Sequence, residues 1–168
     1  YDNHKDCLPV NRSMRVSPVI IVGGVLLLVA AAAGFLLINK LQPTTQLFLG
    51  DGVFDARVAY TQAEREKGLS GVENMKPTDA LIFAYPGDDI WKIWMKDMKI
   101  PIDIVWLDSN RKVIYVVKDA SPDGGTDVIF APKVPARYVV KLPAGTVDRT
   151  AIKADKAAVF DIKQEDIR

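Results

Sequence analysis

The sequence predicts a mainly β domain, an antiparallel sandwich or barrel with two short helices, preceded by one transmembrane helix. Short apolar runs with strand character recur about every 8 to 12 residues along most of the chain. No long helical pattern separates these runs, which favours antiparallel strands over a parallel sheet. The third observation is that residues 19–38 contain no charge, and about 20 apolar residues suffice for a helix to cross a bilayer.

The predicted membrane anchor reads VIIVGGVLLLVAAAAGFLLI over residues 19–38. Arg12 and Arg15 precede this run closely, whereas only Lys40 follows it closely. Because basic residues favour the cytoplasmic side, residues 1–18 are expected to form a cytoplasmic tail and the domain to lie outside the membrane.

Two alternatives to this reading stay open. A cleaved signal peptide is one, because residues 30–34 (AAAAG) offer the small side chains that signal peptidases accept. The apolar run continues through residues 35–38, beyond the length of a usual signal core, and this favours a retained anchor. The other alternative concerns the start of the chain. If Met14 is the natural start residue, residues 1–13 are not part of the native protein and have no role in the anchor.

The first half of the domain is expected to hold two strands and a helix. Residues 39–45 read as a linker, and the globular domain is expected over residues 46–163, with a tail at 164–168. Apolar and polar residues alternate over 53–60, which predicts a half-buried strand. The following TQAE is a capping box that opens a helix near 62–67, and a glycine closes the helix. An apolar run ended by Pro-Gly (ALIFAYPG) predicts the next strand.

The second half is expected to be a meander of strands with one more helix. Residues 90–98 and 102–107 are expected to form a strand pair around Pro101. The turn-forming residues 108–110 (DSN) predict a hairpin that connects the second of these strands to a strand at 112–118. The remaining expected elements are a strand at 138–142, a short helix at 146–151 and a last strand at 157–162.

The composition excludes several classes of function. The 22 basic and 21 acidic residues nearly cancel, and the part after Pro43 has 18 basic and 19 acidic residues. This balance argues against nucleic-acid binding, which needs clustered positive charge. Because His4 and Cys7 are the only residues of their types, the domain has no histidine or thiol catalysis and no His/Cys zinc site. We therefore expect neither a metal nor a cofactor.

Four blocks in order, TQAEREKGLSG, ALIFAYP, IWMKDMKIPIDIVWLD and PARYVVKLPAG, resemble the prokaryotic family named domain of unknown function 192. The resemblance runs from about Gln46 to Ile162. It implies a compact, mainly β fold that is commonly exported or tethered to a membrane, and it implies no activity. The chain departs from the family pattern where Val72 replaces an arginine and Lys141 replaces a glutamate, and its 121–126 loop lacks two cysteines found in many members.

The predicted strand pair carries the densest candidate site. Strand alternation places Trp94 and Lys96 on one face, where apolar and charged side chains mix as they do in a cleft. Lys96 could pair with Asp103 across the turn at Pro101, which would set a cation beside an aromatic wall suited to an anionic or carbohydrate ligand. In the structural alternative, Trp94 and Met95 belong to the core, and the stem of Lys96 covers them.

Three other features have structural explanations that we favour. Arg65 is a candidate ligand-binding residue, but a clamp between the helix and a carboxylate of the sheet is the preferred interpretation. Asp88 and Asp89 could act as paired carboxylates or hold a cation, although a solvated turn fits better. Trp106 is expected in the core, and residues 123–127 (DGGTD) lack the spacing of a calcium loop.

Two classes of function remain open from the sequence. The first is a binding or interaction module that uses Trp94, Lys96 and Asp103 to hold a ligand, an envelope polymer or an envelope protein outside the membrane. The second is a hydrolase or lyase that uses lysine and carboxylates, with Lys96 or Asp103 activated by burial. The missing histidine and cysteine favour the first, whereas a closed pocket around Lys96 would favour the second.

Overall fold

The computed structural model describes residues 44–168. The predicted tail, the anchor at 19–38 and nearly all of the linker lie outside the described residues. Among the residues described, no helix is long and apolar enough to cross a membrane.

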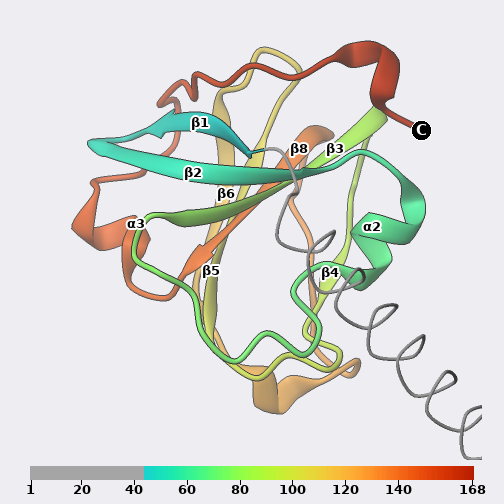
Figure 1. Cartoon of the computed structure of the whole chain (residues 1–168), viewed down its shortest axis with the longest axis vertical. Helices are drawn as coiled ribbons and strands as arrows, with labels where there is room; N and C mark the ends of the chain where they lie inside the picture. Colours follow the sequence, from blue (N-terminus) through green and yellow to red (C-terminus); the bar gives the residue numbers. More distant parts are fainter. Residues whose placement is uncertain (1–43) are drawn as a thin grey trace, which may run out of the picture. The chain divides into compact units, whose positions relative to one another are not determined.

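The described part of the chain is built on one mixed sheet of six strands (Figure 1). The strand order is β1-β2-β3-β8-β5-β6, and a second, two-stranded sheet pairs β4 with β7. The strands are β1 (Thr44–Leu49), β2 (Gly52–Ala59), β3 (Asp79–Asp89), β4 (Ile93–Trp94), β5 (Ile102–Leu107), β6 (Val113–Ala120), β7 (Ile129–Phe130) and β8 (Ala136–Pro143). The helices are α2 (Gln62–Lys67) and α3 (Thr146–Arg149), with 3-10 turns η1 (Pro122–Gly124) and η2 (Gln164–Asp166).

The prediction of a mainly β fold with two short helices is confirmed, but the sheet is not wholly antiparallel. β2 pairs with β3 in parallel, in a register that joins Ala56 to Ala80. The connection contains α2, which lets the chain return and run in the same direction as β2. All other strand pairs of the described residues are antiparallel, including the predicted β5–β6 hairpin.

The predicted strand pair of residues 90–98 and 102–107 is wrong. β5 lies between β6 and β8, so both of its edges are already hydrogen-bonded. Only Ile93 and Trp94 are extended in a strand, and they pair with β7. The chain turns directly afterwards, where Met98 N donates to Met95 O and Asp97 has a φ of 54°.

The predicted last strand at 157–162 is reduced to two isolated bridges. Val159 pairs with Phe48 of β1, and Ala157 pairs with Lys112 just before β6. Backbone hydrogen bonds join Val159 to Phe48 on one side, and Asp155, Lys156 and Ala158 to residues 111–113 on the other, but no regular strand forms.

Both faces of the central strands are buried. Successive side chains of a strand point to opposite faces, so Ile82 belongs to one apolar cluster while Phe83 belongs to the other. The second cluster also contains Trp106, which is 0% exposed as predicted and donates its indole N–H to Trp91 O at 2.9 Å. Burial on both faces explains why the central strands read as continuous apolar runs.

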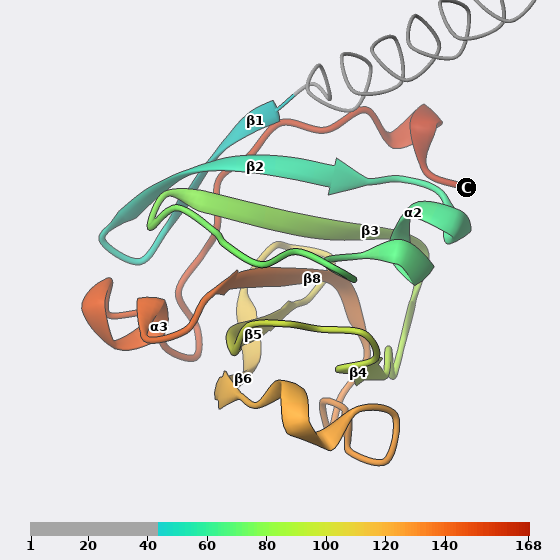
Figure 2. The ribbon, with the colours of Figure 1, turned by 60° about the horizontal axis from the view of Figure 1, so that its bottom comes forward.

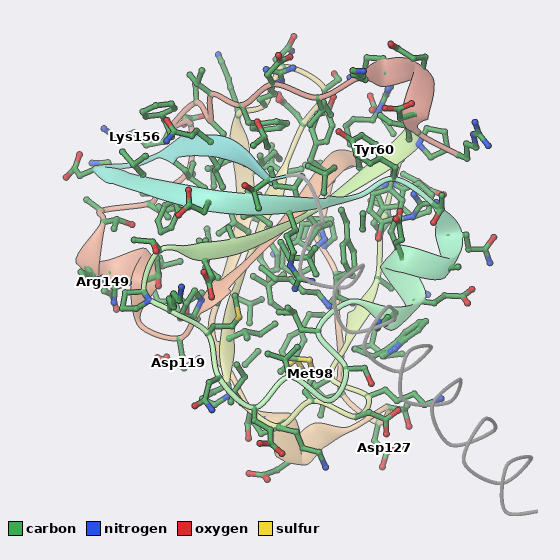
Figure 3. All side chains as sticks on the ribbon, in the orientation of Figure 1. Tyr60, Met98, Asp119, Asp127, Arg149 and Lys156 are labelled. Carbon is green, nitrogen blue, oxygen red and sulfur yellow. The ribbon has the colours of Figure 1, made fainter. Side chains whose placement is uncertain are left out.

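Covering elements lie at opposite ends of the sheet. Figure 2 shows α2 and β4 toward one end and α3 toward the other. In Figure 3, Tyr60 marks the entry to α2, while Arg149 and Lys156 lie at the far end. The end with α2 and β4 holds the candidate site.

Candidate functional site

A cavity of about 640 Å³ opens beside α2, on the side of the sheet formed by the second apolar cluster. Its walls come from α2 and the following turn, from the end of β3, and from the segment around β4. Ligand sites of small molecules commonly have volumes of about 300 to 1,000 Å³. The cavity is therefore large enough for a small-molecule ligand.

The capping box predicted at Thr61 forms and fixes the start of α2. The Thr61 hydroxyl accepts from Glu64 N at 3.3 Å, and the Glu64 carboxylate accepts from Thr61 N at 2.9 Å. At the other end the helix closes at Gly68, whose φ of 47° favours glycine. These two caps position the helix residues that line the cavity.

Arg65 clamps α2 to the sheet, as predicted, but through carbonyl groups rather than a carboxylate. Its guanidinium donates to Tyr60 O at 2.7 Å, to Ala84 O at 2.8 Å and to Arg168 O at 2.7 Å. The guanidinium carbon also lies 4.9 Å from the centre of the Tyr85 ring. Arg65 lines the cavity, yet most of its donor capacity is used inside the protein.

An aromatic wall stands beside this clamp. The rings of Tyr85 and Trp91 stack with their centres 3.8 Å apart and their planes 8° from parallel. Phe83 meets Tyr85 edge-on at 6.4 Å. Burial raises the pKa of Tyr85 to about 12, against the opposing effect of Arg65, so the phenol stays protonated at neutral pH.

Lys141 is a buried charged residue of this site that the sequence reasoning did not propose, and the Tyr85–Trp91 wall was not proposed either. Lys141 is 5% exposed and lies in β8, where it pairs with Leu81 of β3. Its side chain lines the cavity. A Cβ added to Gly68 would lie 3.3 Å from its Nζ, and Nζ lies 4.5 Å from the centre of the Phe83 ring. The signal for its burial is a single lysine inside the apolar run YVVKLP.

The Lys141 ammonium has no carboxylate partner. Within residues 44–168, the ion pairs are Lys118–Asp148 and Arg137–Asp88, and no hydrogen bond involves Lys141 Nζ. Because burial penalises the charged form, the pKa of Lys141 falls to about 8. A buried lysine without a partner, facing a cavity, is typical of a functional position.

The structure brings three of the four predicted site residues together. Arg65, Trp94 and Lys96 all line the cavity, whereas Asp103 does not. Trp94 is 45% exposed at the rim, so its assignment to the core is wrong, while Met95 is buried as that alternative expected.

The predicted ion pair between Lys96 and Asp103 does not form. Asp103 is 0% exposed, and its carboxylate accepts from Asp119 N at 2.9 Å, Gly145 N at 3.3 Å and Val147 N at 2.7 Å. Strand alternation explains the error: Ile102 and Ile104 belong to the cluster on the cavity side, so Asp103 points to the other face. Lys96 is exposed at the cavity instead.

The acidic candidates show no metal-binding geometry. Asp88 pairs with Arg137, and the Asp89 carboxylate accepts from the backbone of Ile90. Asp123 bonds with Ser121 in η1. No group of three His, Cys, Asp or Glu side chains within residues 44–168 is arranged to hold a metal ion.

Comparison with known proteins assigns the chain to a family. The model of DUF192, described as "Uncharacterized ACR", matches residues 45–160 and so covers nearly all of the sheet. The chain belongs to the DUF192 family. A "UPF0127 protein" of Thermococcus gammatolerans is 32% identical over 110 residues, which cover 64% of this chain and 67% of that protein.

Two solved structures share the fold of this DUF192 domain. A protein of unknown function from Novosphingobium aromaticivorans superposes with a TM-score of 0.63 at 24% identity, over 69% of this chain and 83% of that one. A proposed transcription regulator from Sinorhizobium meliloti superposes with a TM-score of 0.62 at 22% identity, over 69% and 91%. At these identities the likeness concerns the fold alone.

Proposed function

We propose that this DUF192 domain is a binding module for a small anionic ligand with a flat apolar body, held in the cavity beside α2. The observation that carries the proposal is the charge of the lining: six basic side chains against two acidic ones. The basic residues are Arg65, Lys67, Lys92, Lys96, Lys141 and Arg168, and the acidic residues are Glu66 and Asp89.

This positive charge is local to the cavity. The chain after Pro43 has 18 basic and 19 acidic residues. If these charges were spread evenly over the surface, every part of the surface would be nearly neutral. Lys67, Lys92 and Lys96 are exposed and can move to meet a ligand. Clustered basic side chains around a concave site attract anions and hold them by charge-assisted hydrogen bonds.

The apolar part of the lining supports a ligand with a hydrophobic body. Leu69, Phe83, Tyr85, Ile93 and Met98 are buried in the second cluster and also line the cavity. The stacked Tyr85–Trp91 pair offers a rigid aromatic wall, and such walls favour flat groups through stacking and edge contacts. A ligand of this chemistry would place its ring against the wall and its anionic group toward the lysines.

A hydrolase or lyase based on Lys96 or Asp103 has less support. Lys96 is exposed rather than activated by burial. All hydrogen bonds found for the Asp103 carboxylate go to backbone amides, on the face away from the cavity. Lysine chemistry in this domain would have to come from Lys141.

We also propose that residues 19–38 tether the binding domain to a membrane, with the domain on the extracytoplasmic side. The support is the uncharged run of apolar residues and the two arginines before it. Removing residues 1–40 should move the protein from the membrane fraction to the soluble fraction. Recovery of a full-length chain in the soluble fraction would contradict the tether.

A matched pair of ligands tests the binding proposal. Titration of the full-length protein with 2-naphthoate should change the fluorescence of the tryptophans at the cavity, and 2-naphthamide should bind about tenfold more weakly or worse, a difference of about 1.4 kcal/mol. Lys96→Met should weaken 2-naphthoate binding several-fold. The control Lys156→Met, at the opposite end of the sheet (Figure 3), should leave binding unchanged. Equal binding of the acid and the amide would overturn the proposal.

A further inference from the structure

We propose that Lys141 forms an imine with an aldehyde or ketone group of the ligand, so that the cavity captures anionic carbonyl compounds. This inference rests on the proposed binding function and names the ligand class more narrowly. It assigns a chemical role to Lys141, the buried cavity lysine that has no hydrogen-bond or ion-pair partner within residues 44–168.

The position of Nζ makes it available to a ligand. No side-chain nitrogen or oxygen of residues 44–168 is both sealed from solvent and without a hydrogen-bond partner. Since Nζ has no partner among these residues, it must reach solvent-accessible space, and Lys141 lines the cavity beside α2. Gly68 leaves this space free, because a Cβ there would approach Nζ to 3.3 Å.

The surroundings of Nζ favour the neutral amine that the reaction needs. Neither of the two carboxylates that line the cavity, Glu66 and Asp89, forms an ion pair with Lys141. With its pKa lowered to about 8 by burial, Lys141 holds a substantial neutral fraction near neutral pH. Lysines activated in this way attack carbonyl groups.

The reaction balances without an oxidant or reductant. The nitrogen lone pair attacks the carbonyl carbon, the C=O π electrons move to oxygen, and a proton passes from nitrogen to that oxygen to give a carbinolamine. The C–O bond then breaks, and the oxygen leaves as water after taking up a proton. The nitrogen loses its remaining proton, so that lysine and ligand end as an imine plus one water. Attack needs a positioned carbonyl, which the basic rim and the aromatic wall would provide.

A reductive trapping experiment tests this inference. The full-length protein is incubated with 4-carboxybenzaldehyde and cyanoborohydride at about pH 7.5, and the labelled lysines are identified by peptide mass mapping. Lys141 should be labelled at least about tenfold faster than the exposed Lys156, and its rate should rise with a midpoint near pH 8. Labelling of Lys141 no faster than Lys156, or labelling mainly at Lys96, would overturn the inference.

Two controls separate this inference from the binding proposal. The alcohol 4-(hydroxymethyl)benzoate carries the same anion and ring but cannot form an imine, so its binding reports the site alone. Binding of the alcohol without rapid labelling of Lys141 refutes the imine and leaves the binding module standing, whereas failure of both refutes both. Lys141→Arg keeps a positive charge but cannot form the imine, so the trapped adduct at residue 141 should disappear. Unchanged tryptophan fluorescence of this variant would show that it is still folded.

Discussion

Asp103 and Lys141 are two buried charged residues on neighbouring strands, and they differ in what surrounds them. They are almost opposite each other in the sheet, where Asp103 pairs with Leu142 and Lys141 pairs with Ile104. Asp103 faces the first apolar cluster and accepts from three backbone amides. Lys141 faces the second cluster, where its Nζ lies 4.5 Å from the centre of the Phe83 ring and has no hydrogen bond to residues 44–168.

From this difference we infer that Asp103 is a structural charge and propose that Lys141 is a functional one. The Asp103 carboxylate joins Asp119 of β6 to Gly145 and Val147 at the start of α3, so its burial fixes three segments at once. Buried charges are tolerated when hydrogen bonds compensate for lost hydration. Lys141 lacks that compensation and opens on a cavity, which is the pattern expected where a ligand supplies the missing partner.

Replacing Asp103 should have the largest effect on stability. Asp103→Ala leaves three buried amides without an acceptor, and the free energy of unfolding should fall by about 4 kcal/mol. Urea denaturation measures this loss. Because Lys96 is not its partner, the effects of Asp103→Ala and Lys96→Met should add in the double variant. A strong coupling between the two would show that the ion pair exists in solution.

Replacing Lys141 should increase the stability of the domain, whereas replacing Asp103 should decrease it. Moving a lysine pKa from 10.5 to about 8 corresponds to about 3 kcal/mol of lost stability at neutral pH. The cation–π contact with Phe83 offsets part of this loss. Lys141→Met should therefore raise the free energy of unfolding by about 2 kcal/mol at pH 7. It should also abolish the capture of carbonyl ligands.

The pH dependence sharpens this prediction. Between about pH 8 and 10.5 the native protein has released the Lys141 proton while the unfolded chain still holds it. The stability of the wild type should rise with pH through this range, relative to that of Lys141→Met, and the advantage of the variant should shrink. Parallel urea melts at several pH values measure the difference, and a constant gap would contradict the lowered pKa.

Arg65 is another cation at the cavity, and its hydrogen bonds to three carbonyl groups resemble the compensated charge of Asp103. Arg65→Lys keeps the charge but cannot reach three carbonyls at once, so we expect a loss of about 1.5 kcal/mol. Amide hydrogen exchange near the chain end should also increase, because the contact with Arg168 O is lost. Unchanged exchange there would argue against the clamp.

The smallest expected effect concerns the helix that carries Arg65. Thr61→Ala removes the hydroxyl of the capping box, and the free energy of unfolding should fall by about 1 kcal/mol. Thr61→Ser keeps the hydroxyl and serves as the matched control in the same thermal melts. Equal losses in both variants would point to packing of the methyl group rather than to the cap.

The local pattern of the sequence predicted much of the fold but not the pairing of its strands. Alternation located β2, the capping box located α2, and the apolar runs located β3 and β5. The turn residues Pro143–Gly145 indicated the short helix α3. The parallel β2–β3 pair was missed because pairing depends on contacts distant in the sequence. β5 is apolar on both faces, so its pattern could not show that Asp103 points away from the cavity.

The candidate site was predicted in part for the same reason. Trp94 and Lys96 were proposed from strand alternation and Arg65 from its place in the capped helix, and all three line the cavity. Lys141 was missed because a lysine in a strand usually extends its stem to reach water. In the structure Gly68, at the end of α2, lies close to the buried Lys141 side chain, a contact that the local sequence does not reveal.

The most direct test of the account is the titration of the lysine side chains by NMR, with the Lys141 signal assigned by its loss in Lys141→Met. We expect the Lys141 signal to titrate with a midpoint near pH 8. This midpoint should move upward when 2-naphthoate binds, because a nearby anion stabilises the ammonium form. A Lys141 signal that titrates near the ordinary value of about 10.4, or one that ignores the bound anion, would contradict the account.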